Sequence, residues 1–149
     1  MSKNARPRRS ILYMPGSNAR ALEKGRTLAA DGLILDLEDA VAPAGKETAR
    51  ERLGAALAQA GSRGGTRLVR INALGSPWGE ADLAALAAWD CDGVVVPKVD
   101  GLADLDAVAA RTTRPLWAMI ETPHALFNLE ELFQTTSFFI LTSPIYFLT

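Results

Sequence analysis

Short apolar runs and helical stripes alternate along this chain. Five apolar runs, each followed by a stretch with helical periodicity, occupy residues 10–15, 32–38, 67–73, 92–98 and 115–122. Most of these runs are continuous rather than alternating, which is typical of parallel strands that are covered on both faces. Between the runs, apolar residues recur at helical spacing, as in Ala49, Leu53, Ala56, Leu57 and Ala60. The alternation predicts an α/β fold with a parallel sheet.

The ends of the apolar runs favour a barrel over an open, doubly wound sheet. No GxGxxG or GxxxxGK[ST] motif follows any run, which weakens the nucleotide-binding open-sheet interpretation. Polar or turn-forming residues stand at all five ends: residues 15–17; Asp36, Glu38 and Asp39; Arg70 and Asn72; Lys98; and Glu121 and Thr122. Reactive side chains at the carboxyl ends of many strands are typical of a (β/α)8 TIM barrel. We therefore expect a partial TIM barrel of about five βα units, with its strand ends opening onto one face.

The stretch DLED carries three carboxylates in four positions, Asp36, Glu38 and Asp39. Crowded carboxylates repel one another and resist burial, so a local function or a local cation is expected. A period of two puts Asp36 and Glu38 on one face of a regular strand and Asp39 on the other. At most two of them are therefore expected to face one site, and a capping cluster at the strand end is the alternative to a direct function.

Composition and charge narrow the functional classes. The chain has 149 residues, of which 48% are hydrophobic and 22% charged, and its net charge is −1. This balance fits one globular domain and argues against a general nucleic-acid or membrane-surface role. The single cysteine, Cys91, excludes an internal disulfide and fits a reducing compartment, so a cytoplasmic location is expected. The basic residues 1–9 lack a following apolar stretch and predict a flexible, solvated N-terminal arm.

The last residues differ from the rest of the chain. Residues 134–149 contain no charge and no helical stripe, and Pro144 interrupts them. They are fewer than the ~20 residues that span a bilayer. We expect a partial barrel domain over residues 10–133 and an atypical apolar tail over 134–149, with the reading frame or gene interrupted near residue 134. No regular strand is expected after residue 133, although the tail could supply a makeshift sixth strand.

Five motifs, in order, resemble a known family. RRSILYMPGSNARALEKG, LILDLEDAVAPAGKETAR, LVRINALGSPWGEADL, GVVVPKVDG and AMIETPHAL are similar to segments of the HpcH/HpaI aldolase and citrate lyase β-subunit family, over roughly residues 8–133. The likeness is greatest to the citrate lyase β-like and malyl-CoA lyase branch. The resemblance implies a TIM barrel, often in trimers or hexamers, that uses Mg²⁺ to cleave or form carbon–carbon bonds in acyl-CoA thioesters.

The resemblance also implies roles for individual residues. Glu121 matches a metal ligand that also serves in catalysis and substrate binding, Arg70 a catalytic residue that clamps the substrate, and Lys24 a residue that contacts CoA. Asp36, Glu38 and Asp39 match an acidic motif close to the metal, and Lys46 and Lys98 match with open roles. Simpler interpretations remain: Glu121 as a carboxylate at a helix N-terminus, Arg70 in a buried ion pair with Asp36 or Glu38, and Lys24 as a surface residue.

The departures from the family pattern leave the activity open. We expect no counterpart in these 149 residues for the family's second metal aspartate, its last strands or its C-terminal acidic segment. The expected function is a Mg²⁺-dependent carbon–carbon lyase acting on an acyl-CoA thioester, or binding its 2-oxo acid product, and impaired by truncation. A malyl-CoA thioesterase on the same scaffold and a non-catalytic barrel fragment are the alternatives. A homo-oligomer is expected, without nucleic-acid or membrane partners.

Overall fold

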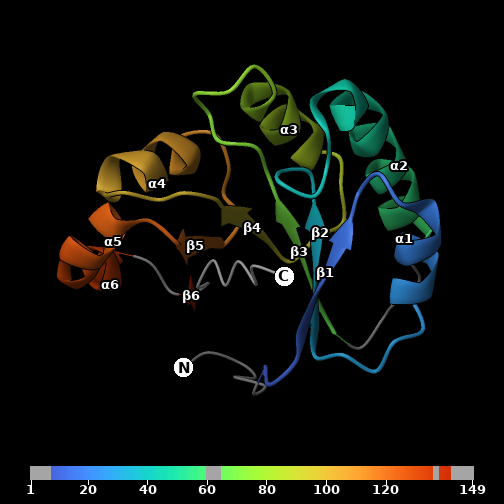
Figure 1. Ribbon diagram of the computed structural model, residues 1–149, viewed down its shortest axis with the longest axis horizontal. Coiled ribbons are helices and arrows are strands. Elements are labelled where there is room, and N and C mark those ends of the chain that lie inside the picture. The colour runs from blue at the N-terminus through green and yellow to red at the C-terminus, as the bar shows by residue number, and fades with distance from the viewer. Residues whose placement is uncertain (1–7, 60–64, 136–137, 142–149) are drawn as a thin grey trace, which may run out of the picture.

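One curved parallel sheet forms the centre of the molecule (Figure 1). The computed structural model describes residues 8–59, 65–135 and 138–141. Within them, each strand pairs in parallel with the next strand along the chain. The strands are β1 (Ile11–Pro15), β2 (Gly32–Asp36), β3 (Thr66–Arg70), β4 (Gly93–Val96), β5 (Leu116–Ile120) and β6 (Phe138–Leu141). The predicted parallel α/β sheet is confirmed.

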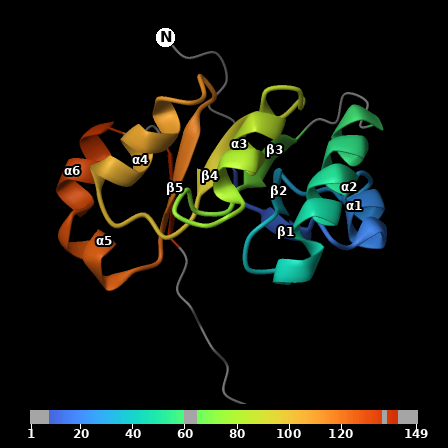
Figure 2. The ribbon, with the colours of Figure 1, turned by 90° about the horizontal axis from the view of Figure 1, so that it is seen from above.

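The helices cover the convex side of this sheet (Figures 1 and 2). They are α1 (Ala19–Gly25), α2 (Lys46–Gln59), α3 (Gly79–Leu86), α4 (Leu102–Ala109), α5 (Pro123–Phe127) and α6 (Leu129–Thr135), with a 3-10 turn, η1 (Pro43–Gly45), before α2. When parallel strands follow one another in sequential order, right-handed crossovers put every helix on the same side. This is the arrangement of a barrel rather than of an open doubly wound sheet, so the expected partial TIM barrel is confirmed.

Side chains alternate between two apolar layers along each strand. Leu33, Leu35 and Val69 pack with helix residues such as Leu53 in the larger core cluster. A smaller cluster, on the other side of the strands, consists of Ile34, Leu68, Val95, Trp117 and Met119. Burial on both sides explains why the runs in the sequence are continuously apolar.

β6 lies within the segment that the sequence pattern sets apart as a tail. It pairs with β5, with Trp117 opposite Phe138 and Ile120 opposite Leu141. The expectation that no regular strand follows residue 133 is therefore wrong, and the alternative of a sixth strand from the tail is correct. Residues 142–149 lie outside the described residues.

The chain before β1 is held where the structure describes it. The Arg8 guanidinium donates to the Thr66 hydroxyl, and the backbone N–H groups of Arg9 and Ser10 donate to the Asp31 carboxylate. These contacts tie the end of the expected N-terminal arm to the segments that precede β2 and β3. Residues 1–7 of the arm lie outside the described residues. Among the helices that the structure describes, none has the length and apolarity needed to cross a membrane.

Candidate functional site

The polar residues at the carboxyl ends of β2, β3, β4 and β5 meet at one end of the sheet. Parallel strands bring their carboxyl ends to the same edge, and the loops after them then share one face. We call Asp36, Glu38, Asp39, Arg70, Lys98 and Glu121 the strand-end cluster. All six are linked by direct hydrogen bonds or ion pairs, which are described next.

Arg70 and Asp36 form the buried centre of the cluster. They lie opposite one another in the β2–β3 register. Arg70 donates from Nε to Asp36 Oδ1 at 2.7 Å and from Nη2 to Asp36 Oδ2 at 2.6 Å. The guanidinium also stacks over the Tyr13 ring at 5.1 Å, and its Nη1 approaches Met119 Sδ at 3.7 Å. A two-pronged ion pair of this kind fixes the plane of the guanidinium.

Glu38 and Asp39 join the same cluster through Lys98. The Lys98 ammonium donates to Glu38 Oε1, and to Asp39 Oδ1 at 3.2 Å, while Glu38 Oε2 lies 3.3 Å from Arg70 Nη1. The expectation that Asp39 points to the other face is wrong, because β2 ends at Asp36 and the strand period no longer applies beyond it. All three carboxylates of the motif therefore meet one pair of cations.

Burial and neighbouring charges shift the pKa values of the Glu38 and Asp39 carboxylates in opposite directions. Burial raises the pKa of Glu38 above its ordinary value, although the hydrogen bond from Lys98 and the charge of Arg70 oppose this effect. Partial burial also acts to raise the pKa of Asp39, but the hydrogen bonds to Lys98 and Glu38 and the charges of Lys98 and Arg70 together outweigh it, so the pKa of Asp39 is lowered. The hydrogen bond to Glu38 raises the pKa of Lys98, and burial raises the pKa of the Tyr13 hydroxyl. Lys98 and Arg70 therefore stay cationic at neutral pH.

Glu121 follows β5 and is half-buried. Its Oε1 accepts a hydrogen bond of 2.8 Å from the backbone N–H of Lys98. Mg²⁺ is commonly held by one or two carboxylates, with water and substrate oxygens as its other ligands. In the part of the chain that the structure describes, no three His, Cys, Asp or Glu side chains are placed to hold a metal together. The residues present therefore fit a magnesium ion held by Glu121 with water or substrate oxygens, and not a closed protein cage.

A second, fully buried network lies directly behind the cluster. The Lys46 ammonium donates to the carbonyls of Leu37 and Glu38, at 2.8 and 2.7 Å, and to the Asn72 side-chain oxygen at 2.7 Å. The Asn72 amide in turn donates to Asp82 at 2.6 Å. Burial lowers the pKa of Lys46. This network fixes the backbone that carries the acidic motif.

Two of the three residues in this network had signals in the sequence. Lys46 stands in the GKETAR stretch that matched the family, and Asn72 stands at a strand end. Asp82 was missed, because a carboxylate in the first turn of a helix ordinarily serves the helix dipole and faces solvent. In the structure it is buried and accepts hydrogen bonds from Arg50 and from the Asn72 backbone and side chain.

A cavity of about 370 Å³ opens beside the cluster. Its walls come from the loops after β2 and β3 and from Lys98, and they include Glu38, Asp39, Lys46, Asn72, Ser76 and Trp78. The lining combines both charge signs with one aromatic ring. A cavity with these features at the carboxyl end of a sheet is a candidate ligand site.

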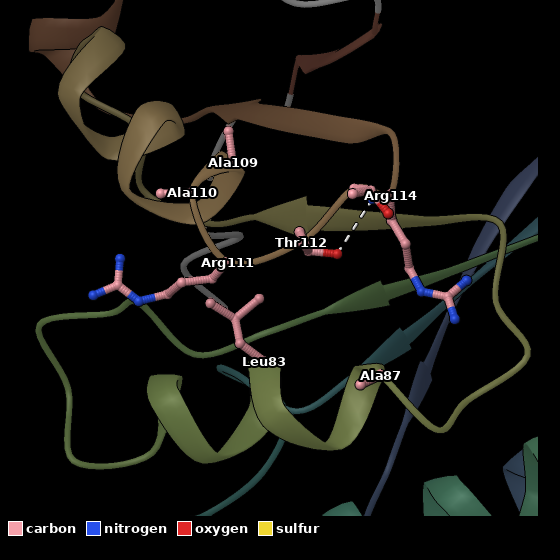
Figure 3. Close-up of a pocket in the computed structure, with 8 residues that line it drawn as sticks. Leu83, Ala87, Ala109, Ala110, Arg111, Thr112 and Arg114 are labelled. Carbon is pink, nitrogen blue, oxygen red and sulfur yellow. Dashed lines mark hydrogen bonds between the residues drawn. The ribbon is translucent and has the colours of Figure 1, made fainter.

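Another cavity, of about 690 Å³, lies between α3 and the chain that leads from α4 into β5 (Figure 3). Because residues 110–114 precede β5, this cavity is at the opposite end of the strands from the cluster. Arg111 and Arg114 extend away from one another in Figure 3. Arg111 pairs with Glu80, and Arg114 donates to the carbonyls of Leu86, Trp89 and Cys91. Both guanidinium groups therefore serve local structure.

Lys24 lies apart from these interactions. It is in the last turn of α1, and its side chain is exposed. The described contacts of the strand-end cluster do not involve it. The role in CoA contact that the sequence resemblance implies thus stays a prediction, as do the implied roles of Arg70 and Glu121.

Comparisons with known proteins decide the family. A profile of the HpcH/HpaI aldolase/citrate lyase family matches residues 9–141. This chain belongs to the HpcH/HpaI aldolase/citrate lyase family. The match includes β6, so the family likeness extends beyond the residue 133 boundary inferred from the motifs.

Individual relatives point in two functional directions. A protein of Cereibacter sphaeroides named (3S)-malyl-CoA thioesterase is 49% identical over 133 residues, which are 89% of this chain and 47% of that protein. The citrate lyase subunit beta of Escherichia coli is 41% identical over 103 residues, 69% of this chain and 34% of that subunit. The chain thus spans less than half the length of either relative.

The solved structures agree on the fold. The protein CitE from Mycobacterium tuberculosis, solved in complex with magnesium, acetoacetate and coenzyme A, superposes with a TM-score of 0.69 at 32% identity. The superposition covers 85% of this chain and 45% of that one. Magnesium, acetoacetate and coenzyme A were bound to CitE, and they suggest which ligands to test with this chain.

Proposed function

We propose that the strand-end cluster belongs to a Mg²⁺-dependent carbon–carbon lyase that acts on an acyl-CoA thioester and releases or binds a 2-oxo acid. The observation that carries the proposal is the placement of Arg70 and Glu121 in one cluster at the carboxyl ends of β3 and β5, in a member of the HpcH/HpaI aldolase/citrate lyase family. The CitE complex with magnesium, acetoacetate and coenzyme A supports it.

The reaction assigns distinct tasks to the two residues. When a β-hydroxy acyl thioester is cleaved, its hydroxyl loses a proton and becomes the carbonyl of the 2-oxo acid. The electron pair of the broken carbon–carbon bond passes to the thioester as an enolate, which is then protonated. A bound Mg²⁺ would polarise the oxygens and stabilise the negative charge. In our proposal Glu121 holds the ion, and Arg70 orients the carboxylate of the 2-oxo acid.

Asp36 determines how Arg70 can meet that carboxylate. The Nε–Nη2 edge of the guanidinium is engaged by Asp36, so the substrate clamp that the family resemblance implies for Arg70 must use a different edge. Asp36 and the Tyr13 ring hold the guanidinium in one plane. In the proposed complex the substrate carboxylate meets the Nη1 side, next to Glu38 and Met119.

Ligand binding tests the proposal directly. Oxaloacetate should bind the purified 149-residue chain in the presence of Mg²⁺. Arg70→Lys should weaken this binding ~10-fold, since a lysine keeps the charge but loses the planar donors. Lys24→Ala, an exposed matched control, should leave oxaloacetate binding unchanged and weaken binding of CoA. If both substitutions weakened binding of the same ligand equally, the assignment of oxaloacetate to Arg70 and of CoA to Lys24 would be contradicted.

The Cereibacter relative named a malyl-CoA thioesterase favours a second candidate, thioester hydrolysis at the same site. Product analysis by mass spectrometry separates the two after incubation with malyl-CoA and Mg²⁺. Acetyl-CoA and glyoxylate indicate the lyase, whereas free CoA and malate indicate hydrolysis. Because the described residues offer a single metal carboxylate, turnover should stay below ~1 s⁻¹, and Glu121→Gln should abolish it. A chain that neither binds these ligands nor forms product has the non-catalytic role instead.

A further inference from the structure

Lys98 has an unusual backbone conformation. Among the residues that the structure describes, it is the one non-glycine residue with a positive φ, 51°. This left-handed region is unfavourable for a residue with a Cβ, so it persists only where the surroundings require it. Such conformations concentrate at functional sites. The contacts that Lys98 makes show the effect of its left-handed conformation.

The conformation lets one residue contact three carboxylates at once. The Lys98 N–H donates to Glu121 Oε1 at 2.8 Å, on the side of β5. Its ammonium reaches in the other direction, to Glu38 and Asp39 after β2. Lys98 therefore connects the acidic motif to Glu121 across the intervening strands.

We propose that Lys98 is a positioning residue for Glu121. Its left-handed backbone aims the N–H at the Glu121 carboxylate and holds that carboxylate in one orientation. Its ammonium meanwhile occupies the position next to Glu38 and Asp39, where a cation would otherwise be attracted. A divalent cation is thereby directed to Glu121 and away from the acidic motif. The part of this inference that concerns the cation rests on the proposed function.

Two substitutions at residue 98 separate the effect of the backbone conformation from the effect of the side-chain charge. Lys98→Asn and Lys98→Val both remove the ammonium, but asparagine tolerates the left-handed region and a β-branched valine does not. Asparagine should keep the N–H on Glu121, while valine should move it away. Any difference between the two variants thus reports the backbone conformation and not the lost charge.

Hydrogen exchange of the residue 98 amide, measured by NMR without metal, gives the first readout. After correction for intrinsic rates, exchange should be ~10-fold faster in Lys98→Val and in Glu121→Ala than in the wild type. Lys98→Asn should stay close to the wild type. The Glu121→Ala variant leaves residue 98 untouched, so this comparison holds even if Lys98→Val fails to fold. Equal exchange in the wild type and Glu121→Ala would overturn the proposal.

Mn²⁺ affinity, measured by calorimetry, gives the second readout. Loss of a group that orients a metal ligand typically weakens metal binding by ~10–100-fold. Lys98→Val should lose affinity by about this factor, and Lys98→Asn by clearly less. Equal affinities in the two variants would contradict the positioning role. If the wild type binds no Mn²⁺, the proposed function fails, while the exchange measurement still decides whether Lys98 orients Glu121.

Discussion

At the scale of single residues, Asp36 accepts four hydrogen bonds while its side chain is fully buried. Two come from Arg70, and the others come from the backbone N–H groups of Glu38 and Ala40. The same carboxylate therefore orients the guanidinium and shapes the turn that carries the acidic motif. A residue that the family resemblance places near the metal also has a structural task.

Asp36→Asn is expected to destabilise the protein strongly. The substitution leaves Arg70 as a buried cation with a weakened partner, and breaking a buried ion pair costs about 3–5 kcal/mol. Glu80→Gln, which disrupts the exposed pair with Arg111, should cost no more than about 1 kcal/mol. Urea unfolding of the three proteins measures both effects. Similar losses in the two variants would show that Arg70 does not depend on Asp36.

Asp31 links stability to pH at the other end of the sheet. Hydrogen bonds from the backbone of Ser10 and Arg9 hold its pKa below the ordinary value of 3.8. A depressed folded-state pKa stabilises the protein above the unfolded-state pKa, and this contribution is lost as the pH falls through the folded-state pKa. The wild type should be more stable than Asp31→Asn at neutral pH, and the difference should vanish in acid. A difference in urea midpoint that is constant with pH would contradict this.

Residue patterns predicted part of this site. The grouping of strand-end residues on one face followed from parallel topology, and Asp36 and Glu38 both contact Arg70, as expected for two residues that face one site. The place of Asp39 did not follow, because it depends on where β2 stops. The burial of Lys46 was not predictable either, since its acceptors include two carbonyls, and carbonyl positions carry no sequence signal.

At the scale of elements, the connection from β3 to α3 depends on close backbone packing. A Cβ on Gly79, the first residue of α3, would lie 2.4 Å from the Ala73 carbonyl oxygen. Gly75, in the same connection, has no atom within 4 Å of its hypothetical Cβ. This connection includes Ser76 and Trp78, which line the cavity beside the cluster.

Gly79→Ala should therefore destabilise the protein, by about 1–3 kcal/mol, as overpacking against a rigid backbone does. Gly75→Ala should be neutral or stabilise it by up to about 1 kcal/mol, because it restricts the unfolded chain without a clash. Thermal unfolding of the pair provides the measurement. Comparable melting temperatures would show that the connection shifts to admit the methyl group.

Element prediction succeeded where an apolar run alternated with a helical stripe and failed for β6, where this alternation stops. The 14-residue α2 repeats its apolar stripe over several turns, and Pro43 marks its beginning in η1. β6 has four residues, as β4 does, but it stands in an uncharged segment without the helical stripe that follows each of the other runs. Its pairing with β5 is a tertiary effect, which local sequence does not encode.

At the scale of the whole molecule, the described sheet ends in two outer strands. β1 pairs with β2 alone, and β6 with β5 alone. On β1, Leu12 and Tyr13 are 40% and 39% exposed. An uncovered outer strand with apolar side chains favours pairing with a further strand.

The 149-residue chain, produced alone, is therefore expected to self-associate. Leu12→Lys should shift it toward the monomer, because a charge on an outer strand opposes edge pairing. Leu126→Lys is the matched control, since Leu126 is exposed on α5, away from β1. Size-exclusion chromatography with light scattering compares the three proteins over a concentration series. A wild type that is monomeric throughout, or an equal response to both substitutions, would contradict the prediction.

The sequential strand order has a consequence for how the chain is made. A ribosome releases the strands in the order in which they pair, so each new strand meets a partner that has already emerged. Asp36 and Arg70 are 34 residues apart, and both lie upstream of Lys98 and Glu121. The buried ion pair can thus form on the nascent chain before translation reaches the codon for Glu121. Glu121, which we propose as the metal ligand, is then added beside a charged pair that has already formed.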